Sequence, residues 1–288
     1  MFRSVACLLM VIGLASCSGN LTDTDGQPSD TFALQDAADF SKQIERELAT
    51  RGAYVAMVFR SGATQAALPD EIDYSHGSFW VYTPIETDDG RTLYGYAVYN
   101  LYHGIEDQTQ SDLVQDWPLD FTRADDTGTV GIIIPNAAMQ ARILDVLASD
   151  DYYELHQSQY ALMSSPTDLR FQNAPEFILD VVASAAWKTT DRDQIKVNID
   201  AYFDETTIEI GGFGKFLAPI QDVRNHLQDQ PGMIHTSSFA SIAQFMENFD
   251  LSDESFELVS DVLPVEVDTG DTASEEDNQA QIQTLRRE

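Results

Sequence analysis

Apolar residues recur at helical spacing between positions 177 and 185, in the most regular pattern of the chain. They follow a polar stretch in which Asn173 can cap a helix, with Pro175 and Glu176 in its first turn. The pattern therefore predicts a helix that begins at Ala174 and runs towards Trp187. The recurring apolar positions are Phe177, Ile178, Val181, Val182 and Ala185.

The segments before this helix predict strands and two further helices. Helical spacing within Phe40–Leu48 predicts a helix that stops at Gly52, and the same spacing within Met139–Leu147 predicts another. Continuous or alternating apolar residues predict strands at 53–60 and Thr129–Ile134. The strongest strand signal is a hairpin, in which Gly77–Thr83 and Leu93–Tyr99 flank a short turn at Asp88–Gly90. We expect Thr109–Asp116 to form a surface loop or short helix.

After the central helix, the pattern predicts helices at Asp191–Phe203 and Ser238–Phe249 and a short strand at Thr207–Ile210. The sequence contains no internal repeat. The mixture of a hairpin, isolated strands and separate helices predicts one α+β domain, with an antiparallel sheet packed against helices, over residues 36–250. The acidic remainder, 251–288, is expected to be a mostly disordered tail.

The charge balance excludes several classes of function. The chain has 16 Lys and Arg against 48 Asp and Glu among its 288 residues, a net charge of −32. Such a charge repels nucleic acid and anionic lipid surfaces, so we expect no nucleic-acid partner. Gly211–Lys215 contains several glycines but lacks the ending of a phosphate-binding loop, and it is interpreted as a turn.

The N-terminus has the features of an export signal. A short positive start precedes an apolar run, Val5–Leu14, that is too short to span a membrane, and Leu14–Cys17 closes it. This ending resembles the lipobox of bacterial lipoproteins. The resemblance implies a signal peptide at 1–16, a lipidated Cys17, a polar tether over 17–35, and anchoring in the bacterial envelope. Ser18 resembles the sorting signal for the outer membrane, facing the periplasm.

The only cysteines are Cys7 and Cys17. The mature chain therefore has no thiol beyond the lipidated position, which excludes disulfides and thiolate metal sites. The five histidines are too widely spaced for a zinc site on one helix, and we expect neither a metal nor a cofactor.

His76 is the most promising candidate for a catalytic base. It opens the first strand of the hairpin, and if the turn centres near Asp88 it lies opposite Asn100. A histidine held by a polar partner on a neighbouring strand is the arrangement that nucleophilic catalysis requires.

Three short motifs in this order resemble the bacterial domain-of-unknown-function family numbered 2145. They are Tyr74–Phe79, Val98–Tyr102 and Phe171–Phe177, the last followed by Leu179 and Asp180. The resemblance covers about residues 35 to 250. It implies a permuted papain-like domain of the NlpC type, in which the histidine strand precedes the helix that carries the nucleophile.

The resemblance also implies roles for individual residues. His76 matches the general base, Asn100 is its candidate orienting partner, and Gln172 and Asn173 lead into the nucleophile position and line a groove with Tyr99. That position holds Ala174, where the family pattern has a cysteine. A methyl group cannot attack a carbonyl, and loss of a nucleophile costs on the order of a millionfold in turnover.

We therefore expect an envelope lipoprotein with a degenerate site that binds peptide or cell-wall material without cleaving it. Two alternatives stay open. One is an active peptidase or amidase in which Ala174 is an engineered change or another nucleophile serves. The other is a structural or interaction lipoprotein with a vestigial groove. The sequence specifies neither the ligand nor the oligomeric state.

Overall fold

A computed structural model describes residues 34–62, 69, 71–87, 89–104, 107–125, 127–209 and 233–262. The expected signal peptide, Cys17, nearly all of the tether, the turn at Gly211–Lys215 and the end of the tail lie outside these residues. Within the described part, no helix is both long and apolar enough to cross a membrane.

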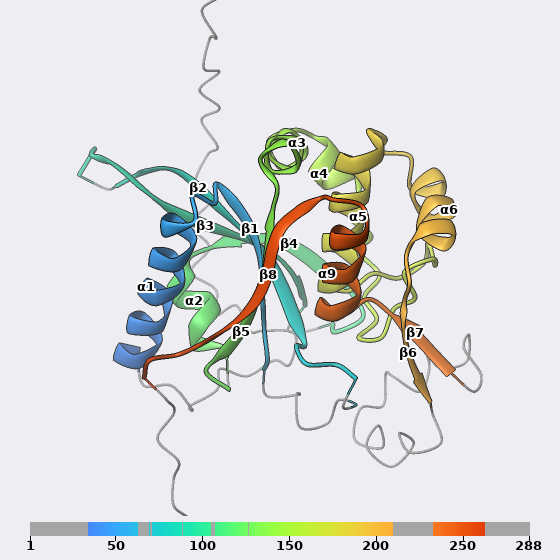
Figure 1. The fold of residues 1–288 in the computed structure, drawn as a ribbon, viewed down its shortest axis with the longest axis horizontal. Coiled ribbons are helices and arrows are strands. Elements are labelled where there is room, and N and C mark those ends of the chain that lie inside the picture. Colours follow the sequence, from blue (N-terminus) through green and yellow to red (C-terminus); the bar gives the residue numbers. More distant parts are fainter. Residues whose placement is uncertain are drawn as a thin grey trace, which may run out of the picture.

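Six antiparallel strands form the central sheet, in the order β4-β3-β2-β1-β5-β8. Their bounds are β1 Val55–Arg60, β2 His76–Glu86, β3 Thr92–His103, β4 Ser111–Asp116, β5 Thr129–Pro135 and β8 Ser252–Val259. The hairpin of β2 and β3 is the longest pairing and projects beyond the rest of the sheet (Figure 1). A separate two-stranded ribbon pairs β6 Thr206–Glu209 with β7 Met233–Thr236.

Helices cover both faces of the sheet (Figure 1). Successive side chains of each strand point to opposite faces, so every strand contributes side chains to the packing on both. Helices α1 (Leu34–Thr50) and α2 (Pro118–Arg123) pack on one face, against residues such as Val58 and Trp80. Helices α3 (Ala137–Leu147), α5 (Ala174–Trp187) and α9 (Phe239–Asn248) pack on the other, against Phe59 and Phe79. The two faces are called the α1 face and the α5 face below.

Helix α5 is buried on nearly all sides because other elements enclose it. The sheet lies on one side, α3 and α4 (Asp151–Glu154) lie beside it, and α6 (Arg192–Tyr202) packs on its outer surface. Its start is capped as predicted, since Oδ1 of Asn173 accepts a hydrogen bond of 2.9 Å from the backbone N–H of Glu176. The α+β fold class predicted from the sequence is confirmed.

Two expectations about the sheet edges were wrong. The stretch 109–116, expected as a loop or short helix, contains the edge strand β4, in which Leu113 packs on the α5 face. The acidic stretch after residue 250, expected as a tail, begins with the other edge strand, β8, which pairs with β5. In β8 only Phe256 and Leu258 pack against the core. Edge strands need few apolar residues, and solvated acidic side chains conceal their alternation in the sequence.

Candidate functional site

His76 belongs to a buried polar network on the α1 face of the sheet. Its Nε2 lies 3.0 Å from Oδ1 of Asn100, whose Nδ2 donates a hydrogen bond of 2.8 Å to Asp116. The hydroxyl of Tyr102 donates to the other carboxylate oxygen at 3.0 Å, and its ring stacks on His76 at a centroid distance of 4.9 Å. The ring of Phe121, from α2, lies 6.1 Å from His76. All these side chains are buried.

The register of the hairpin differs by two residues from the predicted one. Asn100 lies opposite Ser78, whereas His76 pairs with Arg60 of β1. The histidine and the asparagine still meet, because residues offset by two across neighbouring strands share a face and lie within reach of long side chains. The turn lies at the predicted residues, but its centre is at residue 89, one residue beyond the predicted centre, because Glu86 pairs with Thr92.

The network fixes the tautomer of the histidine. While Asp116 is ionised it accepts the amide hydrogen of Asn100, so the Oδ1 atom of Asn100 faces His76 and can only accept. Nε2 of His76 must then carry a hydrogen. An asparagine orients the ring, as a base in nucleophilic catalysis requires.

Asp116 is the acidic residue of the network, and its surroundings shift its pKa. Burial raises its pKa to about 7, and the nearby Asp120 adds to this effect. The hydrogen bonds from Tyr102 and Asn100 and the positive charge of Arg60 act in the opposite direction. The carboxyl group therefore changes its charge near neutral pH, and with it the hydrogen bonding of the network.

The structure does not bring His76 and Ala174 together. A Cβ atom added to Gly77 would lie 2.7 Å from Cδ1 of Ile178 in α5 and 2.7 Å from the ring of Phe59, so Gly77 faces α5. Successive residues of a strand point to opposite faces, so the side chain of His76 points to the α1 face. Ala174, which is 1% exposed, packs in the core on the α5 face.

The residues expected to line a groove are engaged in packing and hydrogen bonds. The side chain of Gln172 accepts from the N–H of Gln157 at 2.8 Å and donates to the carbonyl of Leu155 at 3.1 Å. Asn173 donates to the carbonyl of Leu162 at 2.8 Å while it caps α5. The ring of Tyr99, on the α5 face, packs edge to face with that of Tyr152.

A buried ion cluster joins α5 to α6, and the sequence analysis missed it. Nζ of Lys196 lies 2.6 Å from Glu176 and 2.7 Å from Asp180, and the side chains of both acids are fully buried. Asp180 also accepts a hydrogen bond of 2.7 Å from Gln172. Acids four residues apart on an otherwise apolar helix were the available signal, because they share a face and need a buried partner.

Burial and charge act against each other inside this cluster. Burial raises the pKa of Glu176 to about 7, although Lys196 lowers it. Burial lowers the pKa of Lys196, but the carboxylates of Asp180 and Glu176 outweigh it, and the pKa of the lysine is raised. The lysine therefore stays charged and holds the two helices together.

Two other histidines lie on the α5 face. The hydroxyl of Ser111, at the start of β4, lies 3.0 Å from Nε2 of His156, and burial lowers the pKa of that histidine. The ring of His103 lies 5.4 Å from that of Tyr160, which forms a bridge to Gln172. The role of these residues could not be predicted from the sequence, because their contacts join segments far apart in the chain.

Among the described residues, no group of histidine, cysteine and acidic side chains is arranged to hold a metal ion. A model of a protein family matches residues 47–246, which span most of the sheet and the helices on both faces. The chain belongs to this family, described as an uncharacterized protein conserved in bacteria (DUF2145). The match confirms the family recognised in the sequence, and it includes His76, Asn100 and Ala174. No curated protein and no solved structure matches this DUF2145 chain.

Proposed function

We propose that this DUF2145 protein is an exported lipoprotein that binds peptide or cell-wall material and does not cleave it. The observation that carries the proposal is the state of the expected catalytic position. Ala174 offers no nucleophile, is buried, and lies on the face of the sheet opposite to His76. A base cannot activate a group from which a sheet separates it.

The proposal keeps one part of the papain-like interpretation and revises another. An oriented pair of His76 and Asn100 on neighbouring strands, followed by an asparagine-capped helix, supports a relationship to papain-like hydrolases. The groove expected between His76 and Ala174 has no support from this geometry. Binding therefore takes place at another surface, and the histidine pair serves to hold β2, β3 and β4 together.

Export and anchoring are proposed from the N-terminal segment. The positive start, short apolar run and Leu14–Cys17 support cleavage before Cys17 and its lipidation. Acyl chains contribute about 0.8 kcal/mol per buried methylene, so two or three chains would anchor the protein stably. The high negative charge opposes a second attachment through anionic lipid headgroups. We place the protein in the outer membrane, facing the periplasm.

The test combines binding and turnover on one substrate. The purified lipoprotein, in detergent, is incubated with insoluble cell-wall material, and both cosedimentation and the release of new amino groups are measured. We expect saturable cosedimentation without release. Release that His76→Ala abolishes would instead establish a hydrolase. Neither binding nor release would favour the structural lipoprotein.

A specific contact supports a second candidate function, a serine hydrolase. The hydroxyl of Ser111 and Nε2 of His156 are within hydrogen-bond distance, as a nucleophile and its base must be. Ser111 is only 2% exposed, however, and its hydroxyl also lies 3.3 Å from the carbonyl oxygen of Gln157. An active-site phosphonate probe separates the two candidates. Labelling that Ser111→Ala removes would favour the hydrolase, whereas the binding proposal predicts no labelling.

A further inference from the structure

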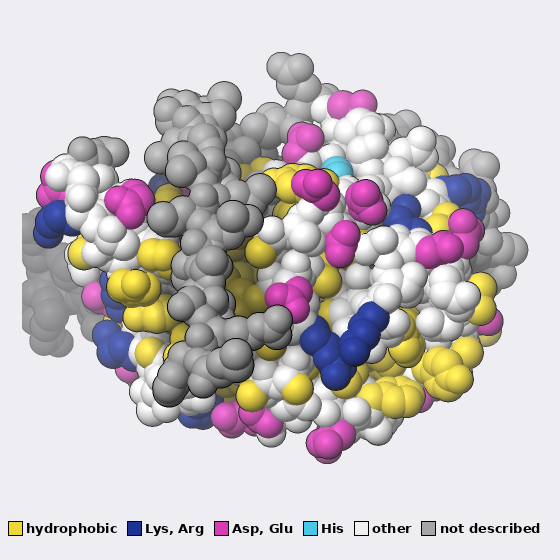
Figure 2. Space-filling view, turned by 90° about the horizontal axis from the view of Figure 1, so that it is seen from above, with side chains coloured by type: hydrophobic (Ala, Val, Ile, Leu, Met, Phe, Trp, Pro, Cys, Tyr) yellow, Lys and Arg dark blue, Asp and Glu magenta, His cyan; other side chains and the backbone are white. Residues whose placement is uncertain are grey.

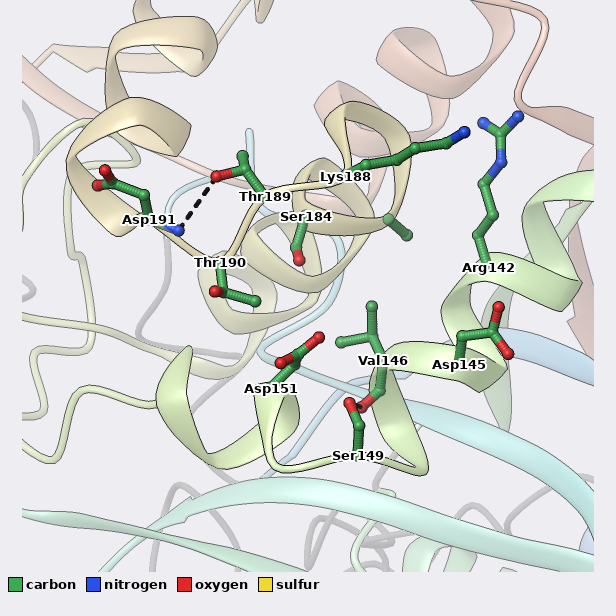
Figure 3. A pocket seen from close by; sticks show the side chains of 11 residues that line it. Arg142, Asp145, Val146, Ser149, Asp151, Ser184, Lys188, Thr189, Thr190 and Asp191 are labelled. Carbon is green, nitrogen blue, oxygen red and sulfur yellow. Dashed lines mark hydrogen bonds between the residues drawn. The ribbon is translucent and has the colours of Figure 1, made fainter.

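A pocket of about 640 Å³ lies between α3, the start of α4 and the C-terminal end of α5 (Figure 3). Its volume is within the range of sites that hold small ligands, roughly 300–1,000 Å³. It lies on the α5 side of the molecule and includes none of the residues that the sequence predicted for a catalytic site or groove.

One end of the pocket is cationic. Arg142 comes from α3, and Lys188 is the C-cap of α5, where its φ of 58° turns the chain away from the helix. In Figure 3 the two side chains extend to the same side. Neither forms an ion pair with any residue that the structure describes, although the chain has three acidic residues for each basic one. Two adjacent cations without a protein partner favour a carboxylate from a ligand.

The other end carries a carboxylate and hydroxyl groups. Asp151 opens α4, and its carboxylate makes no ion pair within the described part of the chain. Thr190 and Ser149 lie beside it (Figure 3). Ser184 points towards the pocket from α5. It is 3% exposed, and its hydroxyl makes no hydrogen bond to another described residue.

An apolar floor separates the two ends. Val146 of α3 and Ala185 of α5 line it, and both belong to the buried core. Two other acids restrict what can enter. Asp145 lies near Arg142 without forming an ion pair, so a ligand with several negative charges is disfavoured. Asp191 is engaged as the N-cap of α6, where it accepts from Gln194.

We propose that this pocket binds an amphoteric ligand, a short peptide with a free amino group and a free carboxylate. Arg142 and Lys188 hold the carboxylate, Asp151 holds the ammonium group, and Val146 and Ala185 contact the body between them. The hydroxyl of Ser184 donates to or accepts from the backbone of the peptide. The inference rests on the proposed binding function, and it adds the site and the chemical class of the ligand.

The test titrates the full exported protein with alanyl-alanine by calorimetry, and compares the N-acetylated and C-amidated forms of the dipeptide. We expect saturable binding of the dipeptide that is weakened about tenfold or more when either terminal charge is removed, because hydrogen bonds to charged groups contribute about 1.5–3 kcal/mol. Arg142→Gln, Lys188→Asn and Asp151→Asn should weaken binding to a similar degree. Asparagine tolerates the left-handed conformation of position 188.

Arg46→Gln is the matched control, because Arg46 is an exposed helical arginine of α1 on the opposite side of the sheet. Affinities that are the same for all three dipeptides, pocket variants that behave like Arg46→Gln, or a lack of saturable binding would each overturn the inference. The variants are then tested for cosedimentation with cell-wall material. If that binding persists unchanged, only the pocket fails. If the dipeptide binds but the cell wall does not, the proposed source of the ligand fails and the pocket stands.

Discussion

Position 174 shows that the chemistry open to one residue depends on the packing around it. From the sequence, Ala174 occupies the start of a capped helix, where backbone N–H groups and the helix dipole would stabilise a thiolate. In the structure the same position is buried in the core on the α5 face. The dipole is present, but the base and the access that catalysis needs are absent there.

Replacing this alanine by cysteine tests the geometry directly. With Cys17 lipidated, Ala174→Cys would carry the only free thiol of the exported protein. We expect iodoacetamide to alkylate it more slowly than a cysteine in a peptide, because the site is 1% exposed, and we expect His76→Ala to leave the rate unchanged. The measurement is the alkylation rate between pH 6 and 9. Fast reaction that slows in the His76→Ala background would place the two residues on the same side of the sheet and contradict the structure.

Asp116 gives the protein a pH-dependent stability. Its pKa is raised from 3.8 to about 7 in the folded state, so the folded chain keeps a proton that the unfolded chain releases between these values. The stability that this group contributes is therefore complete below about pH 4 and is lost as the pH rises towards 7. Asp116→Asn should remove this loss. We expect the free energy of unfolding of the unaltered protein, relative to the variant, to fall by up to about 1.4 kcal/mol per pH unit between pH 5 and 7.

Urea unfolding at several pH values measures this difference. Asp112→Asn, at an exposed position of the same strand, is the control for a general change in net charge. A constant difference between the protein and Asp116→Asn over this pH range would mean that Asp116 has an ordinary pKa, and that burial does not dominate its surroundings.

At the level of elements, α5 connects most of the features of the domain. It packs on the sheet through Ile178, holds α6 through the ion cluster of Lys196, Glu176 and Asp180, and forms one wall of the pocket at its C-terminal end. Its apolar periodicity accounts for the first of these contacts. The second depends on charges that are stable in the interior only because they are paired.

Lys196→Met should therefore be strongly destabilising. It leaves the buried carboxyl group of Glu176 without a counter-charge and that of Asp180 with only Arg192, at 3.8 Å, and we expect a loss of about 3–5 kcal/mol in the free energy of unfolding. Lys42→Met is the matched control, since Lys42 forms an ion pair with Glu45 on the surface of α1 and should cost less than about 1 kcal/mol. Chemical denaturation at pH 7.5 compares the two. Equal losses would mean that water or protonation already compensates the carboxyl groups of α5.

At the level of the whole molecule, the net charge of −32 and the proposed lipid anchor determine how the protein interacts with membranes. On the face seen in Figure 2, basic side chains form small groups among more widely distributed acidic ones, in keeping with the net charge of −32. A surface of this kind is repelled by anionic membranes, so we propose that the lipid, and not the surface, attaches the protein to the membrane.

Cys17→Ala tests that attachment. We expect the protein to move from the membrane fraction to the soluble periplasmic fraction, because the proposed acyl chains are attached to this cysteine. Cell fractionation with detection of the protein measures the shift, and Ser18→Ala serves as a control that leaves the cysteine intact. Continued sedimentation of Cys17→Ala with membranes, under salt and alkaline washing, would contradict lipid anchoring.

The sequence by itself determined the α+β class, the family, and the capped helix that begins at Ala174, because these depend on periodicity, capping residues and motif order within short segments. It also placed His76 near Asn100, although the register differed by two residues. Only the tertiary structure decided that His76 and Ala174 lie on opposite faces of the sheet. It likewise revealed β4 and β8, the partner of the buried acids in α5, and the mixed-charge pocket. The physical reason is that strand direction, face and long-range ion pairing depend on how distant segments pack, whereas local patterns specify only what each segment can become.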